Sequence, residues 1–204
     1  MRVTVFDYGA GNLHSLMKSL CGEGRNVTLV SNPVLALDTD VLVLPGVGAF
    51  APAAAAMAAA HDTMRSALQA GLPCIGVCLG MQLLFASSDE GEGNGLAIFD
   101  GRVERLQAQH VPQIGWNDIE DATDPLFTRS GLRTAYYANS FVCRPTDPTI
   151  VTAWSTHDGD RFPRPSGSET SLACSSIRRK VRHRACDSSR SFCRHVSDSG
   201  AGPA

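Results

Sequence analysis

The chain has 204 residues and a formal net charge of −2, from 18 basic and 20 acidic side chains. That length supports one sizeable hydrophobic core and is short for two ordinary domains. The near balance of charge excludes nucleic acid and anionic membranes as main partners on electrostatic grounds, and it favours a small neutral or zwitterionic ligand.

The seven cysteines and the first residues indicate the cellular compartment. An odd number of cysteines at irregular spacings is typical of reduced thiols rather than of a disulfide framework. The opening MRVTVFDYGAGN is an alternating apolar strand without the layout of a signal peptide, and no later stretch is long and apolar enough to span a bilayer. We therefore expect a cytoplasmic protein.

In chain order, strand-like runs alternate with helix-like runs. Strands are predicted over RVTVFDY, NVTLVS, DVLVLPG and PCIGVCLG. A core-facing helix between the first two is predicted by apolar residues at helical spacing, namely Leu13, Leu16, Met17 and Leu20, and Gly22–Gly24 closes it. The alanine-rich run from Pro52 to Ala70 predicts a second helix. This alternation indicates an α/β fold with a parallel sheet.

Beyond Gly91 the pattern changes to short strands separated by turn residues, in GLAIFDGRVERL, PQIGWNDIE, TAYYANSFVC and TIVTAWST. Such strands suit an antiparallel extension, so we expect a mixed central sheet. From Arg164 onward the chain carries eight of its 18 basic residues and shows no period of 2 or 3.6. We therefore expect one domain over residues 1–163 and a disordered, basic, serine-rich tail over residues 164–204.

The sharpest local signal is GVCLG, which places Cys78 between glycines after a strand and before the helix-like run MQLLFASS. This has the form of a nucleophile elbow, in which a tight turn exposes the nucleophile. The N-terminus of the following helix would lower the pKa of the thiol. The alternative is a small buried core residue, which is our interpretation of Cys74 in the same strand.

The second signal is PGVGAF, directly after the strand DVLVL and hence at the same edge of a parallel sheet as the elbow. Its glycines leave backbone N–H groups open to a ligand, as an oxyanion hole requires, with the N–H of Leu79 as a further donor. A plain strand-to-helix turn is the alternative. The loop DYGAGN lacks the spacing of a dinucleotide fingerprint. Gln82 lies one helical turn after Cys78, where its amide can bind a polar ligand or remain solvated.

Five segments together carry a resemblance to a known family: FDYGAGNLHSLMKSL, LVLPGVGAF, GLPCIGVCLGMQLLF, VPQIGWN and WSTHDGDRFP. Over residues 1–163 the chain resembles the glutamine amidotransferase subunits of imidazole glycerol phosphate synthases, which act in histidine biosynthesis. The elbow and the glycine loop are shared by all class I glutamine amidotransferases. DYGAGN and P-x-x-G-W-N are particular to this branch.

The resemblance implies a flavodoxin-like fold and a Cys-His-Glu triad in which Cys78 attacks the side-chain carboxamide of glutamine. It implies that Gly46, Val47 and Gly48 line the oxyanion site, and that Gln82, Asn139 and Ser140 surround the glutamine. The family more often has a histidine where Asn139 stands. Ammonia would pass to a separate cyclase subunit, forming a heterodimer that makes imidazole glycerol phosphate and the carboxamide ribonucleotide AICAR. No metal or organic cofactor is implied.

The family's histidine and glutamate lie in a segment GVQFHPEKS, and this sequence has no H-P-E. His183 and Glu169 stand in the tail without the i, i+2 spacing that places two side chains on one face of a strand, so neither is assigned a role. However, LACSSIRRK, residues 172–180, can be encoded by a chosen set of codons that spells GVQFHPEK when read in another frame. We therefore hypothesise a change of reading frame near Pro163, from a sequencing artefact or a mutation, and expect impaired catalysis. A genuine interaction tail is the alternative.

Two rival functions remain open on the sequence. One is a different α/β cysteine enzyme, such as a pyridoxal-synthase glutaminase or a peptidase, against which DYGAGN and P-x-x-G-W-N speak. The other is a non-catalytic subunit that retains the cyclase interface. Trp116 is expected either to anchor that interface or to be a core residue.

Overall fold

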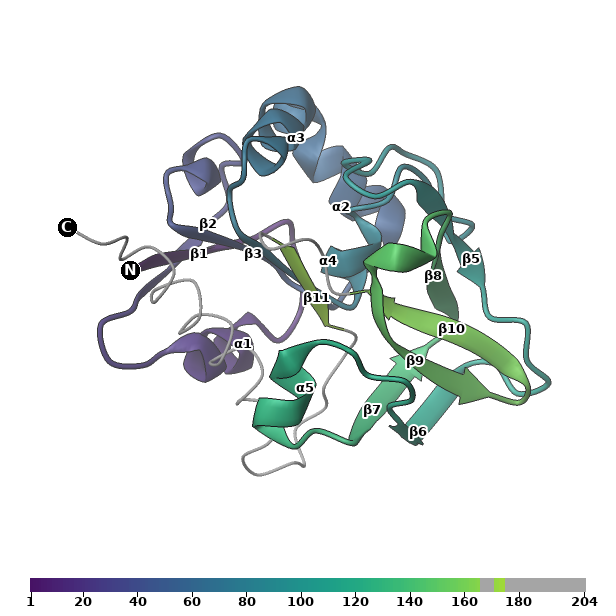
Figure 1. Cartoon of the computed structure of the whole chain (residues 1–204). Helices are drawn as coiled ribbons and strands as arrows, with labels where there is room; N and C mark the ends of the chain where they lie inside the picture. The colour runs from purple at the N-terminus through teal and green to yellow at the C-terminus, as the bar shows by residue number, and fades with distance from the viewer. Residues whose placement is uncertain (166–170, 175–204) are drawn as a thin grey trace.

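The structure is a computed structural model and describes residues 1–165 and 171–174. Its centre is a five-stranded parallel sheet in the order β11-β4-β3-β1-β2 (Figure 1). The strands are β1 (Arg2–Phe6), β2 (Asn26–Val30), β3 (Val41–Leu44), β4 (Cys74–Val77) and β11 (Ser171–Cys174). Apart from its last member this is the strand order of flavodoxin-like sheets, with the order reversing between β1 and β3. The predicted α/β class is confirmed.

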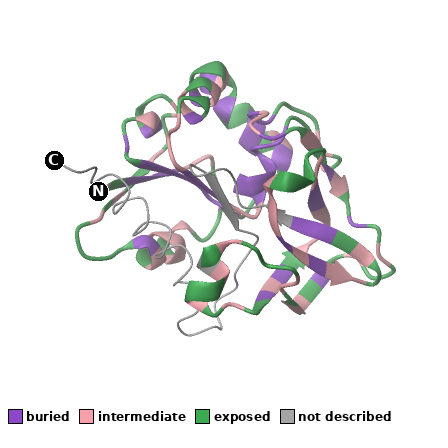
Figure 2. Ribbon diagram, viewed as in Figure 1, coloured by how far each residue is buried: buried purple, intermediate pink, exposed green. Residues whose placement is uncertain are grey.

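Helices cover both faces of the sheet (Figure 1): α1 (Leu13–Leu20) lies on one face, and α2 (Phe50–Met57), η2 (Ala58–Ala60) and α3 (His61–Gln69) lie on the other. Because successive strand residues point to opposite faces, Val41 and Val43 pack with α1, whereas Leu42 and Leu44 pack with α2 and α3. The strands β1, β3 and β4 are mostly buried between these helices (Figure 2). The single helix expected up to Ala70 is interrupted by η2.

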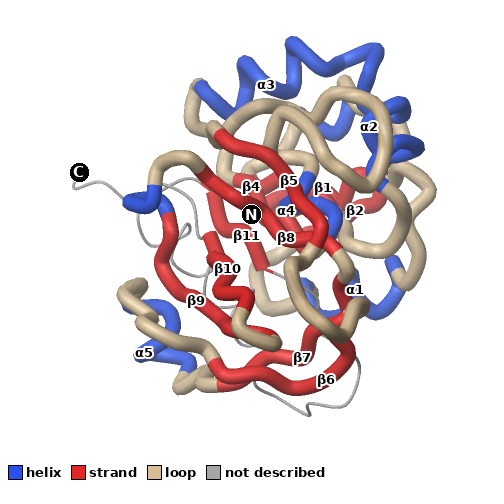
Figure 3. The backbone as a smooth tube through the Cα atoms, turned by 90° about the vertical axis from the view of Figure 1, so that its right-hand side faces the viewer, coloured by secondary structure: helices blue, strands red, loops and turns tan. Residues whose placement is uncertain are grey.

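The strands β5 to β10 pair among themselves rather than extending the central sheet (Figure 3). The antiparallel pairs are β5 (Gly101–Arg105) with β8 (Phe141–Pro145), β6 (Gln113–Asp118) with β7 (Thr134–Asn139), and β9 (Val151–His157) with β10 (Asp160–Pro165). The short helices η1 (Leu35–Leu37), α5 (Pro125–Ser130) and η3 (Pro148–Ile150) lie in connections. Within the described residues the central sheet is therefore parallel, and the expected mixed sheet is wrong.

The helix expected over MQLLFASS is shorter than predicted, because α4 covers only Leu79–Gln82. The carbonyl of Leu83 accepts a hydrogen bond from Leu96 N–H at 2.7 Å, and that of Leu84 accepts one from Ile98 N–H at 2.8 Å. Both carbonyls are thus bonded to a returning segment and are not available to continue a helix.

The expected domain end at residue 163 falls inside β10, which continues to Pro165. The backbone of β11 pairs with β4, with Ser171 opposite Cys74 and Cys174 opposite Val77. The other tail residues, including those of the hypothesised frame change beyond Cys174, lie outside the described residues. Over the described part of the chain, no helix is long and apolar enough to cross a membrane.

Candidate active site

Cys78 stands at a sharp turn between β4 and α4. Its backbone has φ 50° and ψ −105°, a conformation that residues with a side chain rarely adopt. Its carbonyl accepts hydrogen bonds from the N–H groups of Met81 at 3.0 Å and Gln82 at 3.2 Å, so the chain coils immediately after the turn. A strained residue at the apex of a strand-to-helix turn is the geometry of a nucleophile elbow, as GVCLG predicts.

The glycines of the elbow are a steric requirement. A Cβ added at Gly80 would lie 2.0 Å from the carbonyl oxygen of Leu44, and one added at Gly76 would lie 2.8 Å from the backbone nitrogen of Met81. Both neighbours are backbone atoms, so a side chain at either position would force α4 away from the sheet. These glycines therefore let the elbow sit directly on β3 and β4.

The loop after β3 lies against the elbow. A Cβ at Gly46 would lie 2.4 Å from the carbonyl oxygen of Val77 and 3.1 Å from Cβ of Cys78, and one at Gly48 would lie 3.3 Å from Cδ2 of Leu79. The structure thus brings the predicted oxyanion residues to the nucleophile. Their role in binding an oxyanion stays a prediction.

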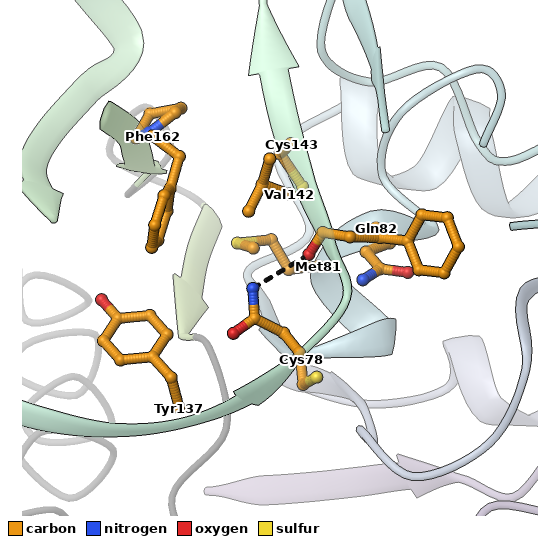
Figure 4. Close-up of a pocket in the computed structure, with 10 residues that line it drawn as sticks. Cys78, Met81, Gln82, Tyr137, Val142, Cys143 and Phe162 are labelled. Carbon is orange, nitrogen blue, oxygen red and sulfur yellow. Dashed lines mark hydrogen bonds between the residues drawn. The ribbon is translucent and has the colours of Figure 1, made fainter. Parts of the chain in front are cut away.

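A pocket opens beside Cys78 (Figure 4). Elbow residues form one side of it, and residues of β7, β8 and β10 form the other; the lining is Cys78, Met81, Gln82, Tyr137, Asn139, Phe141, Val142, Cys143, Phe162 and Pro163. Of the predicted glutamine-binding residues, Gln82 and Asn139 line the pocket. Ser140 is adjacent in sequence but does not line it, and its carbonyl accepts a hydrogen bond from Leu106 N–H at 2.9 Å.

Two carboxamide oxygens in the pocket are buried without a hydrogen-bond partner among the described residues, Oε1 of Gln82 and Oδ1 of Asn139. The Nδ2 group of Asn139 donates to the carbonyl of Phe141 at 3.2 Å, which is the dashed line in Figure 4. Unpaired buried acceptors cost free energy unless a ligand or water donates to them. The pocket therefore suits a ligand with N–H donors.

Apart from Asn139, the residues of the far wall of the pocket were missed at the level of sequence. Tyr137 is 1% exposed, and its hydroxyl lies 2.6 Å from Oγ of Ser155, which donates to the carbonyl of Asp118 at 2.8 Å. The ring of Tyr137 also packs edge-on against Phe162, with centroids 5.6 Å apart. The alternation in TAYYANSFVC places Tyr137 and Asn139 on one face of a strand, which is the signal that identifies this wall.

The other described thiols have different surroundings. Burial raises the pKa of Cys74 to about 12 and also raises the pKa of Cys143, where the nearby Cys78 thiol adds to the effect. Cys21 is exposed on the surface. Of Cys21, Cys74, Cys78 and Cys143, the cysteines whose side chains the structure describes, Cys78 alone combines partial exposure with a place in the pocket.

Within residues 1–165 and 171–174, no histidine lines the pocket. His110 pairs with Asp158 at 2.8 Å near the turn between β9 and β10, and His61 pairs with Asp62 at 3.0 Å at the start of α3. The tail residues His183 and Glu169 lie outside the described part. In that part, no group of His, Cys, Asp and Glu side chains is arranged to hold a metal ion.

Comparison with known proteins agrees with this geometry. The profile of the family "Glutamine amidotransferase class-I" matches residues 4–162. The imidazole glycerol phosphate synthase subunit HisH of Synechococcus sp. (strain JA-2-3B'a(2-13)) is 40% identical over 165 residues, which cover 77% of this chain and 76% of the relative. The HisH subunit of Halobacterium salinarum is 37% identical over 169 residues, with coverage of 79% and 77%.

Solved structures show the same fold. A glutamine amidotransferase crystal structure superposes with a TM-score of 0.64 at 15% identity, covering 98% of this chain and 99% of that one. A glutamine amidotransferase from Thermotoga maritima gives a TM-score of 0.57 at 13% identity, with coverage of 100% and 86%. At these identities the likeness concerns the fold alone.

Proposed function

Because this chain belongs to the class I glutamine amidotransferase family, we propose that it is the glutaminase subunit of an imidazole glycerol phosphate synthase, with Cys78 as its nucleophile. The observation that carries the proposal is the contact between the strained Cys78 elbow and the Gly46–Gly48 loop. The thiolate attacks the carboxamide carbon, and the oxygen becomes an oxyanion next to backbone N–H donors. The C–N bond then breaks as the nitrogen takes up a proton and leaves as ammonia, and water hydrolyses the thioester to glutamate and the free thiol of Cys78.

The pocket supports glutamine as the ligand. Oε1 of Gln82 and Oδ1 of Asn139 are acceptors with no partner in the described part of the chain, and glutamine brings N–H donors in both its ammonium and its carboxamide. Glutamate lacks the carboxamide donors. These two side chains are therefore proposed to bind the substrate, with Ser140 holding the backbone beside them.

Catalysis by the chain as written is proposed to be impaired. A thiol nucleophile needs a neighbouring base to take up its proton and to protonate the leaving nitrogen. No histidine of the described residues lines the pocket, and the family match ends at residue 162. We assign residues 1–163 to the amidotransferase domain and residues 164–204 to a segment that departs from the family through a change of reading frame.

The cyclase subunit is the proposed partner. Ile114 and Trp116 on β6 are 67% and 51% exposed, which excludes the core position considered for Trp116. Trp116 packs edge-on against Tyr136, with ring centroids 5.6 Å apart, so the exposed ring is held in place. Exposed apolar side chains of this kind are typical of protein interfaces. Docking there would also shield ammonia from bulk water.

A second candidate function is a non-catalytic subunit that only binds the cyclase. It is favoured by the exposed Ile114 and Trp116 together with the pocket's lack of a histidine among the described residues. Isothermal titration with the cyclase, paired with a glutaminase assay, separates the two functions. Binding without glutamate release from a frame-restored chain would support the second function.

The substrate assignment is tested by covalent capture. The protein is treated with a chloroketone analogue of glutamine, digested, and analysed by mass spectrometry. We expect modification of Cys78 that is prevented by L-glutamine and much less by L-asparagine, which is one methylene shorter. Modification centred on Cys74 or Cys143, or equal protection by both amino acids, would contradict the proposal.

A further inference from the structure

The Gly46–Gly48 loop is fastened to the first strand-to-helix loop, residues 7–12, at two points. The hydroxyl of Tyr8 donates a hydrogen bond to the carbonyl of Pro45, and the N–H of Gly11 donates to the carbonyl of Val47 at 2.9 Å. Residues about 37 positions apart in sequence are thus joined directly beside the elbow. The two bonds hold alternate peptide units of the glycine loop.

Because a peptide unit is planar, a hydrogen bond that fixes its carbonyl also fixes the direction of its N–H group. In a trans peptide, the carbonyl of one residue and the N–H of the next point in opposite directions. Holding the Pro45 carbonyl therefore sets the direction of the Gly46 N–H, and holding the Val47 carbonyl sets that of the Gly48 N–H. The glycine loop has little stiffness of its own, because its glycines permit many backbone conformations.

Tyr8 is itself held firmly. Its ring packs edge-on against Phe6, with centroids 5.7 Å apart, and joins the core cluster under α2. Burial, and then the nearby thiols of Cys78 and Cys74, raise the pKa of the Tyr8 hydroxyl. The hydroxyl therefore stays protonated over the working pH range and remains a donor to Pro45.

We propose that Tyr8 is a positioning residue for the reaction at Cys78, which acts through the Pro45 carbonyl to hold the glycine loop in the arrangement that stabilises the oxyanion. This inference rests on the proposed function, because it assumes that Cys78 attacks a carbonyl carbon. Tyr8 does not line the pocket. Its effect is on the transition state and leaves ground-state binding of the ligand unchanged.

The test compares two alkylating reagents on the full chain and its Tyr8→Phe variant. With the glutamine-like chloroketone, thiolate attack at the carbonyl passes through an oxyanion; overall an S–C bond forms, chloride leaves and the thiol proton goes to solvent. Iodoacetamide reacts by direct displacement at a saturated carbon and needs no oxyanion site. Modification of Cys78 is followed by mass spectrometry, so the first reagent gives kinact and KI.

We expect Tyr8→Phe to lower kinact for the chloroketone about tenfold, less than the loss of a whole oxyanion donor, with KI unchanged. The iodoacetamide rate and the thermal midpoint should stay near those of the unsubstituted chain. Tyr136→Phe is the matched control, since it removes a hydroxyl from a tyrosine that packs on Trp116 outside the pocket, and it should change neither rate.

Two outcomes would overturn the inference in distinguishable ways. If the unsubstituted chain is captured at Cys78 and Tyr8→Phe leaves kinact unchanged, or lowers both reagents' rates alike, Tyr8 has no positioning role and the proposed function stands. If the chloroketone does not modify Cys78 in the unsubstituted chain, the glutamine site is wrong and the inference falls with it.

Discussion

The two sides of the pocket are built in different ways. The elbow side is made of backbone packed on backbone, where Gly46, Gly76 and Gly80 leave no room for a side chain. The opposite wall is made of side chains from paired strands, held by contacts such as that between Tyr137 and Ser155. The elbow therefore tolerates almost no added volume, whereas the wall can lose single contacts and keep its shape.

The largest expected effect concerns the acid–base partner, which no described residue on either side of the pocket supplies. A frame-restored chain that continues after Pro163 into GVQFHPEKS should release glutamate in the presence of the cyclase roughly 10⁴ to 10⁶ times faster than the chain as written. Purified proteins at equal concentration are compared in a glutamate-release assay. Equal and substantial turnover in both would contradict the frame change and make His183 the first candidate for another base.

The elbow thiol should be the sole site of capture, even though the wall also carries a thiol. Cys78→Ala should abolish labelling by the glutamine-like chloroketone, whereas Cys143→Ala should retain it. Burial keeps the Cys143 thiol protonated by raising its pKa, and Cys74, with a pKa of about 12, stays unreactive at neutral pH. Intact-mass analysis after labelling checks this, and labelling of Cys78→Ala at a stoichiometry near one would refute it.

Adding one methyl group to the elbow side should be costly. In Gly80→Ala the new Cβ would lie 2.0 Å from the Leu44 carbonyl oxygen, so the free energy of unfolding should fall by about 3 kcal/mol. Gly22→Ala is the control, because its Cβ would meet only the flexible end of the Arg25 side chain, and it should cost less than about 1 kcal/mol. Urea titration measures both. Similar losses of unfolding free energy in the two variants would show that the close packing of α4 on β3 does not account for the cost of a side chain at Gly80.

Truncation of a side chain on the outer face of β6 should leave folding nearly intact but weaken binding to the cyclase. Trp116→Ala is expected to weaken binding by about 2 kcal/mol, as for an aromatic interface anchor, with a smaller change in stability because the ring is 51% exposed. Leu35→Ala, which removes a 64% exposed side chain in η1, is the control. Isothermal titration measures both. If Trp116→Ala leaves cyclase binding and folding unchanged, the interface assignment fails.

The smallest expected effect is the loss of one hydroxyl from the wall. Tyr137→Phe removes the contact with Ser155 Oγ at 2.6 Å but leaves Ser155 bonded to the Asp118 carbonyl. The free energy of unfolding should therefore fall by about 1 kcal/mol. Tyr136→Phe, at the surface beside Trp116, should change stability by less than about 0.5 kcal/mol. A loss above about 3 kcal/mol for Tyr137→Phe would mean that the wall is as rigid as the elbow.

The sequence by itself determined the local features of this protein. The spacing of glycines around Cys78 predicted the sharp turn, and the pattern of apolar residues in the first half of the chain predicted α1 and the parallel strands. Both signals depend only on residues that are close in sequence. The family resemblance, carried by five short segments, is confirmed by the match over residues 4–162. The structure shows Gln82 and Asn139 at one pocket, while their role in binding glutamine stays a prediction.

Only the tertiary structure decided how distant segments meet. The helix α4 is short because the carbonyls of Leu83 and Leu84 accept hydrogen bonds from residues 96–99. The helix propensity of MQLLFASS contains no information about those distant partners. Likewise, β5 to β10 pair among themselves, and Tyr8 reaches the Pro45 carbonyl across two loops. Such hydrogen bonds depend on which segments the hydrophobic core brings together, and burial then requires every backbone group there to find a partner.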